Sequence, residues 1–386
     1  MSAVTQAGLE NVVVAQSSRS SVDGDNGRLI YAGYRIQDLA RNATFEEVAY
    51  LLWNGELPTG EALDRLDQEL RAVREVPPGV LDVIRQLPTD AHPMAALRTA
   101  VSALGTLDPD AELAAEDSVA RRRVALRLVA QMPTLIASIE HIRRGEALVP
   151  PRSDLTHAGN FLYMLSGKEP GPAATRAIDA YLVLLADHGF NASTFSARVT
   201  AATMADPYSA VTSAIGTLKG PLHGGANQRV MEMLEQIPDP EAAEGWVLDR
   251  LANKERIMGI GHRVYKTIDP RAAILREMSE AQAAEGDSTY HDIAARIADV
   301  VVAYFEANRP DLRLYPNVDF YSAAVLHAAG VPTDQFTPLF AMSRVAGWTA
   351  HLLEQYADNR LIRPRGQYVG PADRDWLPIE ERAPAS

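Results

Sequence analysis

Helical periodicity runs through almost the whole chain from about Asp38 onward, and this feature most constrains the fold. Apolar residues recur at helical spacing in segment after segment, and Asp-Pro or Thr-Pro pairs that suit helix starts stand at 206–207, 269–270 and 337–338. Only the N-terminal part signals strands, where Asp25-Asn26-Gly27 separates 20–22 from 28–31 and the Asn-Gly pair suits a tight hairpin turn. We therefore predict an all-α fold with a short N-terminal β-hairpin.

Composition excludes several classes of protein. The 386 residues are 47% hydrophobic and 23% charged, as in a globular protein, and the net charge of −13 argues against a nucleic-acid binder. Without cysteine there is no disulfide, thiolate metal ligand or cysteine nucleophile. The start lacks a basic segment followed by an apolar run, and no uncharged apolar run is long enough to span a bilayer. We expect a cytoplasmic protein that binds neither nucleic acid nor membrane.

A change in composition suggests two domains. The chain between Pro221 and about Pro316 is richer in glycine and polar residues than the helical segments on either side. This pattern is typical of a smaller helical domain inserted into a larger one. We predict a discontinuous large domain, residues 1–224 and 326–386, and a small domain, residues 225–325.

The segment 259–271 combines features of an anion site. Asp269 and Pro270 predict a helix start, which leaves Arg271 in the first turn, the unfavourable end of the helix dipole for a cation. Such an arginine is either a solvated surface residue or the partner of an anion outside the helix. Gly259 and Gly261 allow close backbone approach, and the histidine that follows can move protons. The segment is a candidate site for an anionic ligand.

Further residues could complete such a site. His188, His223 and His262 each adjoin glycine at a segment boundary, where rigid scaffolds display working residues, although any one of them alone is more often structural. Asp319 precedes an apolar helix, where the simplest role is an N-cap. Arg344 stands within an apolar helix, so its guanidinium either snorkels to the surface or meets a carboxylate in a bidentate pair.

These residue types favour proton abstraction next to a carbonyl over a metal-dependent hydrolysis or simple binding. Several arginines suit a small di- or tricarboxylate, and a carboxylate with histidines suits proton abstraction next to a carbonyl, with imidazoles stabilising the enolate oxygen. A His/Asp metal-dependent hydrolase is an alternative, but the spacing lacks HExxH and any short ligand cluster. A catalytically silent helical binding scaffold is the third possibility.

At these residues the chain resembles the citrate synthase family, and the match covers nearly its whole length. The resemblance implies a nearly all-α fold of a large and a small domain, a homodimer with composite active sites, and condensation of acetyl-CoA with oxaloacetate, followed by hydrolysis of citryl-CoA to citrate and CoA. The motifs that carry it include Gly27-Arg28-Leu29-Ile30-Tyr31, His92-Pro93-Met94, Asp187-His188, Gly220-Pro221-Leu222-His223-Gly224, Gly261-His262-Arg263-Val264-Tyr265, Pro316-Asn317-Val318-Asp319 and Arg363-Pro364.

The resemblance also implies a role for each site residue. Asp319 matches the base that deprotonates the acetyl methyl group, His223 the donor to the thioester oxygen, and His262 the group that polarises the ketone and protonates the new alkoxide. The matches to oxaloacetate ligands are His188, Arg271, Arg344 and Arg363, the last reaching the partner subunit's site. The matches to CoA-binding residues are Ile257, Met258, Gly259, Ile260, Gly261, Lys266 and Asn317.

Three further expectations follow from the resemblance. No metal or other cofactor is expected, since acetyl-CoA is a substrate. The small domain is expected to close over the active site when oxaloacetate binds. A 2-methylcitrate synthase would use propionyl-CoA with the same residues, and one methyl group changes binding by only about 1 to 3 kcal/mol. Gly189, where many members have Glu, and Leu185, where some have His, leave this substrate preference open.

Overall fold

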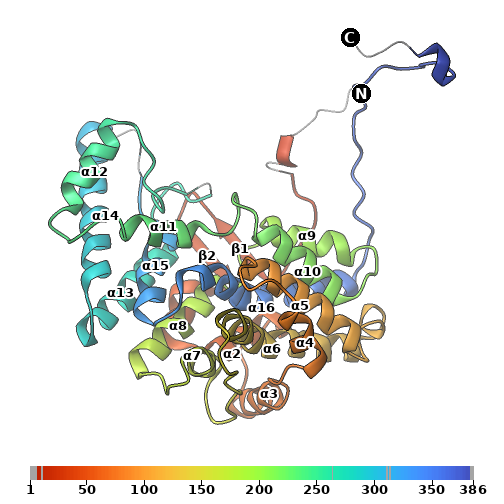
Figure 1. Cartoon of the computed structure of the whole chain (residues 1–386), viewed down its shortest axis with the longest axis horizontal. Helices are drawn as coiled ribbons and strands as arrows, with labels where there is room; N and C mark the ends of the chain where they lie inside the picture. The colour runs from red at the N-terminus through yellow and green to blue at the C-terminus, as the bar shows by residue number, and fades with distance from the viewer. Residues whose placement is uncertain (1–6, 10–11, 263, 310–311, 313, 383–386) are drawn as a thin grey trace.

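The computed structural model describes residues 7–9, 12–262, 264–309, 312 and 314–382, and the chain is almost entirely α-helical (Figure 1). The helices of the first half are α1 (Ile36–Asn42), α2 (Phe45–Asn54), α3 (Gly60–Ala72), α4 (Pro78–Arg85), α5 (Pro93–Leu107), α6 (Ser118–Arg144), α7 (His157–Ser166) and α8 (Pro172–Leu185). Those of the second half are α9 (Ala192–Ala201), α10 (Pro207–Leu218), α11 (Ala226–Leu234), α12 (Ala243–Ala252), α13 (Pro270–Glu285), α14 (Thr289–Asn308), α15 (Val318–Ala328) and α16 (Phe336–Ala357).

The predicted hairpin is confirmed, with one strand more than expected. Strands β1 (Ser20–Asp23) and β2 (Arg28–Tyr31) pair antiparallel, with Ser20 opposite Tyr31. A two-residue strand β3 (Tyr34–Arg35) adds to β2 after a turn in which Ala32 and Gly33 both have positive φ. The all-α fold class with an N-terminal hairpin is therefore confirmed.

Helix α16 lies at the centre of the core. It packs against α2, α6, α8, α9 and α10, and Trp348 near its middle is fully buried. Its start differs from the sequence prediction. The helix begins at Phe336 instead of at the Thr337-Pro338 pair, because the short 3₁₀ turn 333–335 leads directly into it. The caps predicted at Asp206 and Asp269 are confirmed, since both side chains accept backbone N–H groups of the first turn.

Helices α11 to α15 gather on one side of the molecule (Figure 1). Within this group α12 packs on α14, and α15 contacts α11, α13 and α14. Helix α13 also contacts α1 and α8 of the remaining body, so the group borders the core directly. The division into domains at residues 225 and 325 stays a prediction.

The chain ends extend from this body. From the end of α16 to residue 382, where the described chain stops, the backbone has no regular structure except a short turn at Ile379–Glu381, and Figure 1 shows it leading away from the helices. Among the described residues, no helix is both long and apolar enough to cross a membrane.

Candidate active site

The three predicted histidines stand at the ends of helices or between them. His188 follows α8, His223 lies between α10 and α11, and His262 precedes α13. The arginines lie within helices, Arg271 in the first turn of α13 and Arg344 in the middle of α16. The structure therefore draws residues separated by more than 150 positions toward one region, which short-range sequence patterns do not specify.

His188 and His262 are neighbours joined by a tyrosine. Their ring centroids are 6.0 Å apart in an edge-on arrangement, and His188 Nε2 lies 3.0 Å from the hydroxyl of Tyr265. Burial, followed by the charges of Arg271 and Arg344, lowers the pKa of His188 well below its usual value. His188 is therefore a neutral imidazole between two cations.

Hydrogen bonds fix the tautomer of His262. Its Nδ1 accepts the backbone N–H groups of Val264 and Tyr265, both at 3.0 Å, so the ring proton of the neutral imidazole resides on Nε2. Burial lowers the pKa of His262 to about 4, and Arg271 contributes to the same shift. The residue is a neutral hydrogen-bond donor through Nε2 at physiological pH.

His223 has the opposite tautomer. Its Nε2 accepts the backbone N–H of Ser193 at 3.3 Å and lies 2.8 Å from the Ser193 hydroxyl oxygen, which places the ring proton on Nδ1. Ser193 is itself held by Trp348, whose indole N–H donates to that oxygen at 3.1 Å. Burial, with a smaller contribution from Arg344, lowers the pKa of His223 to about 4. His223 is thus a second neutral donor.

Asp319 is a half-buried carboxylate that does not cap its helix. Asn317 is the N-cap of α15, and its side chain accepts the backbone N–H of Asp319 at 2.9 Å. The simple N-cap reading of Asp319 is therefore wrong. Burial raises its pKa to about 6 and outweighs the opposing effect of Arg271. A carboxylate with this pKa is ionised at neutral pH and more basic than an ordinary aspartate.

The two arginines differ in how their charge is balanced. Arg271 is only 3% exposed and forms a bidentate pair with Asp269, Nε to Oδ1 at 3.0 Å and Nη2 to Oδ2 at 2.9 Å. A solvated surface role is therefore excluded, and its partner in this structure belongs to the same helix start. The pair uses two of the five guanidinium N–H groups and leaves three for another acceptor.

Arg344 is a buried cation without a direct carboxylate partner among the described residues. Its side chain is 1% exposed, its Nε donates to the carbonyl of Leu185 at 2.6 Å, and its guanidinium lies 4.8 Å from the ring centroid of Phe340. No carboxylate among the described residues approaches it within ion-pair distance. Burial lowers its pKa, and the charge of Asp187 opposes this shift only in part. An unbalanced buried charge is unfavourable, so the position suits an anionic ligand.

Three of the predicted CoA-binding residues, Gly261, Lys266 and Asn317, line a pocket of about 420 Å³. Gly261 donates its N–H to the carbonyl of Tyr315 at 2.8 Å, and Asn317 returns a bond from Nδ2 to the carbonyl of Gly261 at 2.8 Å. A Cβ on Gly259 would lie 2.9 Å from Phe320, so the tight packing requires glycine there. The pocket is lined by Gly261, His262, Tyr265, Lys266, Thr267, Asp269, Leu312, Leu314, Tyr315, Pro316 and Asn317.

Several predicted residues do not line this pocket, Gly259 and Ile260 among them. Ile257 is buried in the hydrophobic core, so any contact with CoA would involve its backbone, whereas Met258 is only partly buried. Arg363 is exposed and lies in the segment without regular structure that follows α16.

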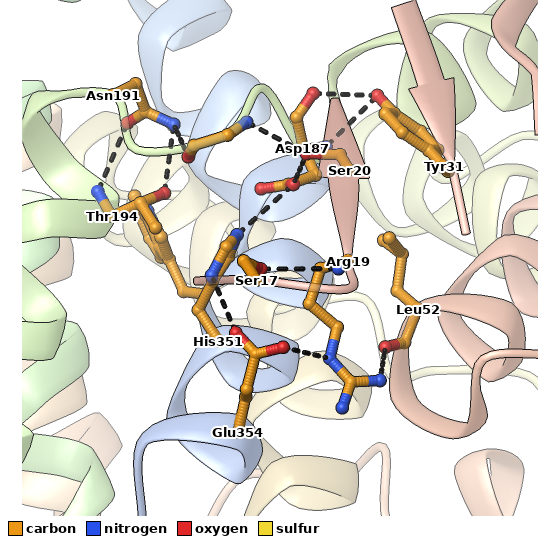
Figure 2. A network of polar contacts seen from close by, with 12 residues as sticks. Ser17, Arg19, Ser20, Tyr31, Leu52, Asp187, Asn191, Thr194, His351 and Glu354 are labelled. Carbon is orange, nitrogen blue, oxygen red and sulfur yellow. Dashed lines mark hydrogen bonds and ion pairs between the residues drawn. The ribbon is translucent and has the colours of Figure 1, made fainter. Parts of the chain in front are cut away.

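A polar network behind His188 was not anticipated from the sequence (Figure 2). The side chain of Asp187 is fully buried, and its Oδ2 accepts the hydroxyl of Ser20 and Nε2–H of His351, the latter at 3.2 Å. Arg198 donates to Nδ1 of His351 at 3.1 Å, which fixes that tautomer. Asp187 stands in a motif next to His188, but its partners come from distant segments. Only the folded structure shows that Asp187 holds the turn that carries His188.

Among the described residues, no group of three or more His, Cys, Asp or Glu side chains is arranged to hold a metal ion.

Comparisons with known proteins identify the family to which this chain is similar. The family model for citrate synthase, C-terminal domain, matches residues 8–365. Citrate synthase from Haloferax volcanii is 51% identical, with 99% of this chain and 100% of the relative covered. A 2-methylcitrate synthase from Corynebacterium glutamicum is more distant, at 43% identity over 97% of each chain.

Solved structures give the same result for the fold. The crystal structure of citrate synthase from Pyrobaculum aerophilum matches with a TM-score of 0.90 at 44% identity, covering 97% of this chain and 95% of the other. The citrate synthase of Thermoplasma acidophilum, solved as a ternary complex with carboxymethyl coenzyme A and oxaloacetate, matches with a TM-score of 0.87 at 34% identity, covering 97% and 98%. The chain described here belongs to the citrate synthase family.

Proposed function

We propose that the protein is an acyltransferase that condenses acetyl-CoA with oxaloacetate and water, giving citrate and CoA through an enol and citryl-CoA. Membership of the family supports this reaction class. The observation that carries the proposal is the combination of two neutral imidazoles with opposite tautomers, a carboxylate of raised pKa and the buried cation Arg344, which has no ion-pair partner among the described residues.

The first step is formation of the enol. Asp319 removes a proton from the methyl group of acetyl-CoA, for which a pKa of about 6 makes it a better base than an exposed aspartate. Nδ1–H of His223 donates to the thioester oxygen as charge develops there. A preorganised donor of this kind stabilises the transition state by about 3 to 4 kcal/mol. Because His223 is neutral, it donates without bringing a full charge into the pocket.

The second step forms the carbon–carbon bond. Nε2–H of His262 polarises the ketone of oxaloacetate, and the enol carbon attacks the carbonyl carbon as the thioester C=O bond forms again. The new alkoxide takes the Nε2 proton of His262, and the proton that Asp319 removed from the methyl group balances this loss over the cycle. Arg344, Arg271 and His188 hold the carboxylates of oxaloacetate. For Arg271 the bond to Asp269 fixes the guanidinium plane while three N–H groups remain available. Hydrolysis of the thioester in citryl-CoA then releases CoA.

CoA would bind along the backbone of 257–261, with Asn317 beside it and Lys266 near a phosphate. The pocket lined by Gly261, Lys266 and Asn317 supports this placement. The related citrate synthase of Thermoplasma acidophilum was solved with a CoA derivative and oxaloacetate, which is the substrate chemistry that we propose here. We propose that neither a metal nor another cofactor takes part, so activity should persist in an excess of chelator.

We also propose that the protein is a cytoplasmic homodimer in which each Arg363 reaches the partner's site, and that residues 225–325 close over bound oxaloacetate. The extended course of the chain after α16 supports the proposed contribution of this segment to a partner subunit. Closure is supported by the positions of the proposed oxaloacetate-binding residues, which lie on α16, on α13 and in the turn after α8. Small-angle scattering should show compaction on adding oxaloacetate, and unchanged dimensions would contradict closure.

A 2-methylcitrate synthase is the second candidate, because members with that name are also relatives of this chain and the proposed catalytic groups suit either acyl-CoA. The higher identity to citrate synthases favours acetyl-CoA.

The proposal is tested by following thiol release and citrate formation with acetyl-CoA and oxaloacetate. Wild-type protein should form both products in chelator, whereas Asp319→Asn should bind oxaloacetate in calorimetry but turn over about a hundredfold to ten-thousandfold more slowly. Activity that disappears in chelator and returns with a metal would favour the hydrolase alternative. A wild-type protein that binds oxaloacetate without releasing thiol would favour a binding scaffold.

A further inference from the structure

The N-terminal hairpin contacts the turn that carries His188 from both of its long strands. On β1, the hydroxyl of Ser20 donates to Oδ2 of Asp187 and accepts the N–H of Gly189 at 3.0 Å. On β2, the hydroxyl of Tyr31 donates to the carbonyl of Asp187 at 2.8 Å and accepts its N–H at 3.1 Å. Figure 2 shows both strand residues beside Asp187. The residues that flank His188 on each side are thus bonded to the hairpin.

The tip of the same hairpin contacts the segment that carries His262. The carbonyl of Gly24 accepts the N–H of Lys266 at 2.9 Å. A Cβ on Gly24 would lie 2.1 Å from the carbonyl oxygen of Val264, although the φ of Gly24 lies outside the left-handed region. Glycine is therefore required at this position by close approach, not by backbone conformation. On the other side of the turn, a Cβ on Gly27 would lie 2.8 Å from the carbonyl oxygen of Ile268.

The residues at the hairpin tip are next to those that orient His262. Val264, which packs against Gly24, donates one of the two backbone N–H groups that hold Nδ1 of His262. Tyr265 donates the other, and its hydroxyl bonds Nε2 of His188. The hairpin, the two histidine segments and Tyr265 therefore form a closed loop of contacts. A shift of the tip moves both the ring and the tautomer-fixing bonds of His262.

We propose that the β1–β2 hairpin is a positioning element that sets His262 relative to His188, and that Gly24 is the residue through which it holds the His262 segment. The inference rests on the proposed function, in which these histidines polarise the ketone and bind a carboxylate of oxaloacetate. The hairpin itself acts through Val264, Tyr265 and Asp187. Because catalysis depends on sub-ångström placement, displacing this contact lowers turnover even when folding is preserved.

Gly24→Ala tests the proposal against Gly171→Ala. Gly171 precedes α8 with an ordinary φ of −67°, and an added Cβ would meet no heavy atom within 4 Å, so alanine is tolerated there. Gly24→Ala should lower kcat for oxaloacetate-dependent thiol release by about tenfold to a hundredfold and raise the KM for oxaloacetate. Ser20→Ala, which frees the turn at His188, should raise the KM for oxaloacetate with a smaller effect on kcat.

A spectroscopic measurement separates this inference from the proposed function. Imidazole ¹⁵N spectra of the wild type should show His262 protonated on Nε2 only, and Gly24→Ala should show a mixture of tautomers at His262 while His223 keeps its proton on Nδ1. This result would support positioning even if the wild type released no thiol. Wild-type kcat, KM and His262 tautomer in Gly24→Ala would overturn the inference. The inference would also be overturned if Gly24→Ala lowered the melting temperature but left kcat per folded molecule at the wild-type value.

Discussion

At the scale of single residues, protonation distinguishes groups that look alike in the sequence. His223 and His262 are both neutral, but Ser193 places the proton of one on Nδ1 and the backbone at 264–265 places the proton of the other on Nε2. The motifs predicted that these histidines work together. The motifs did not predict the tautomers, because each depends on a donor whose orientation only the folded backbone defines.

The contacts of the two arginines were likewise not predictable from the sequence. The sequence predicted that Arg271 seeks an anion, and it did not predict that Asp269, its own helix cap, would be that partner. For Arg344 neither a snorkelling chain nor a bidentate carboxylate pair is found among the described residues. Burial within α16 decides this outcome, because the helix is enclosed on nearly all sides.

The pKa of Asp319 predicts the acid limb of the pH profile. A base must be ionised to act, so lowering the pH through about 6 protonates Asp319 and removes activity. The pKa values of His223 and His262, about 4, keep both imidazoles neutral in this range. The logarithm of kcat/KM for acetyl-CoA should therefore bend near pH 6, with circular dichroism showing that the protein stays folded. A bend near pH 4 would contradict the raised pKa.

At the scale of elements, local signals predicted starts of helices better than short strands. The hairpin followed from Asp25-Asn26-Gly27, and the caps at Asp206 and Asp269 followed from an acceptor side chain before proline. Strand β3 was missed because two residues give no periodicity. The start of α16 was misplaced because the preceding 3₁₀ turn supplies its first-turn geometry without a cap side chain.

The start of α2 carries a buried carboxylate, Glu46, that predicts how stability changes with pH. Glu46 is 3% exposed, its Oε1 accepts the N–H of His157 at 2.8 Å, and its Oε2 has no partner among the described residues. Burial raises its pKa to about 7, and Asp179 contributes to the same shift. The folded state therefore binds this proton more tightly than the unfolded chain, so its contribution to stability is present at low pH and is lost as the pH rises through about 7.

Glu46→Gln should keep the acceptor for His157 and remove the buried charge. Its free energy of unfolding should vary less between pH 5 and pH 8 than that of the wild type, and at pH 8 the variant should be more stable by roughly 2 kcal/mol. Urea unfolding at several pH values measures this. Glu56→Gln, on an exposed loop residue, is the matched control. A Glu46→Gln variant that is less stable than wild type at pH 8 would contradict the assignment.

At the scale of the whole molecule, the segment after α16 leads away from the helices, and Arg363 is an exposed residue of this segment. The resemblance implied this arrangement through its dimer, whereas no local pattern in the sequence could. The same holds for the domain boundaries at 225 and 325, since helix α13 packs on both its own group and α8. These features depend on contacts between distant surfaces, and they remain predictions.

Mixed dimers test whether Arg363 serves the partner. Arg363→Ala and Asp319→Asn should each be nearly inactive alone. In a dimer of one subunit of each, the site with an intact Asp319 receives Arg363 from its partner, so an equal mixture should recover about a quarter of wild-type activity. Arg365→Ala, two positions further along the same segment, serves as the control and should be active alone. No recovery in the mixture would place Arg363 in its own subunit's site.

The choice of acyl group is the central claim about the activity, and parallel thiol-release assays test it most directly. The enzyme is supplied with oxaloacetate and either acetyl-CoA or propionyl-CoA, and kcat/KM is measured for each. We predict oxaloacetate-dependent release from both, with the higher specificity constant for acetyl-CoA by about tenfold or more, the scale that one methyl group supports. A higher specificity constant for propionyl-CoA, or no release from either substrate, would contradict the account.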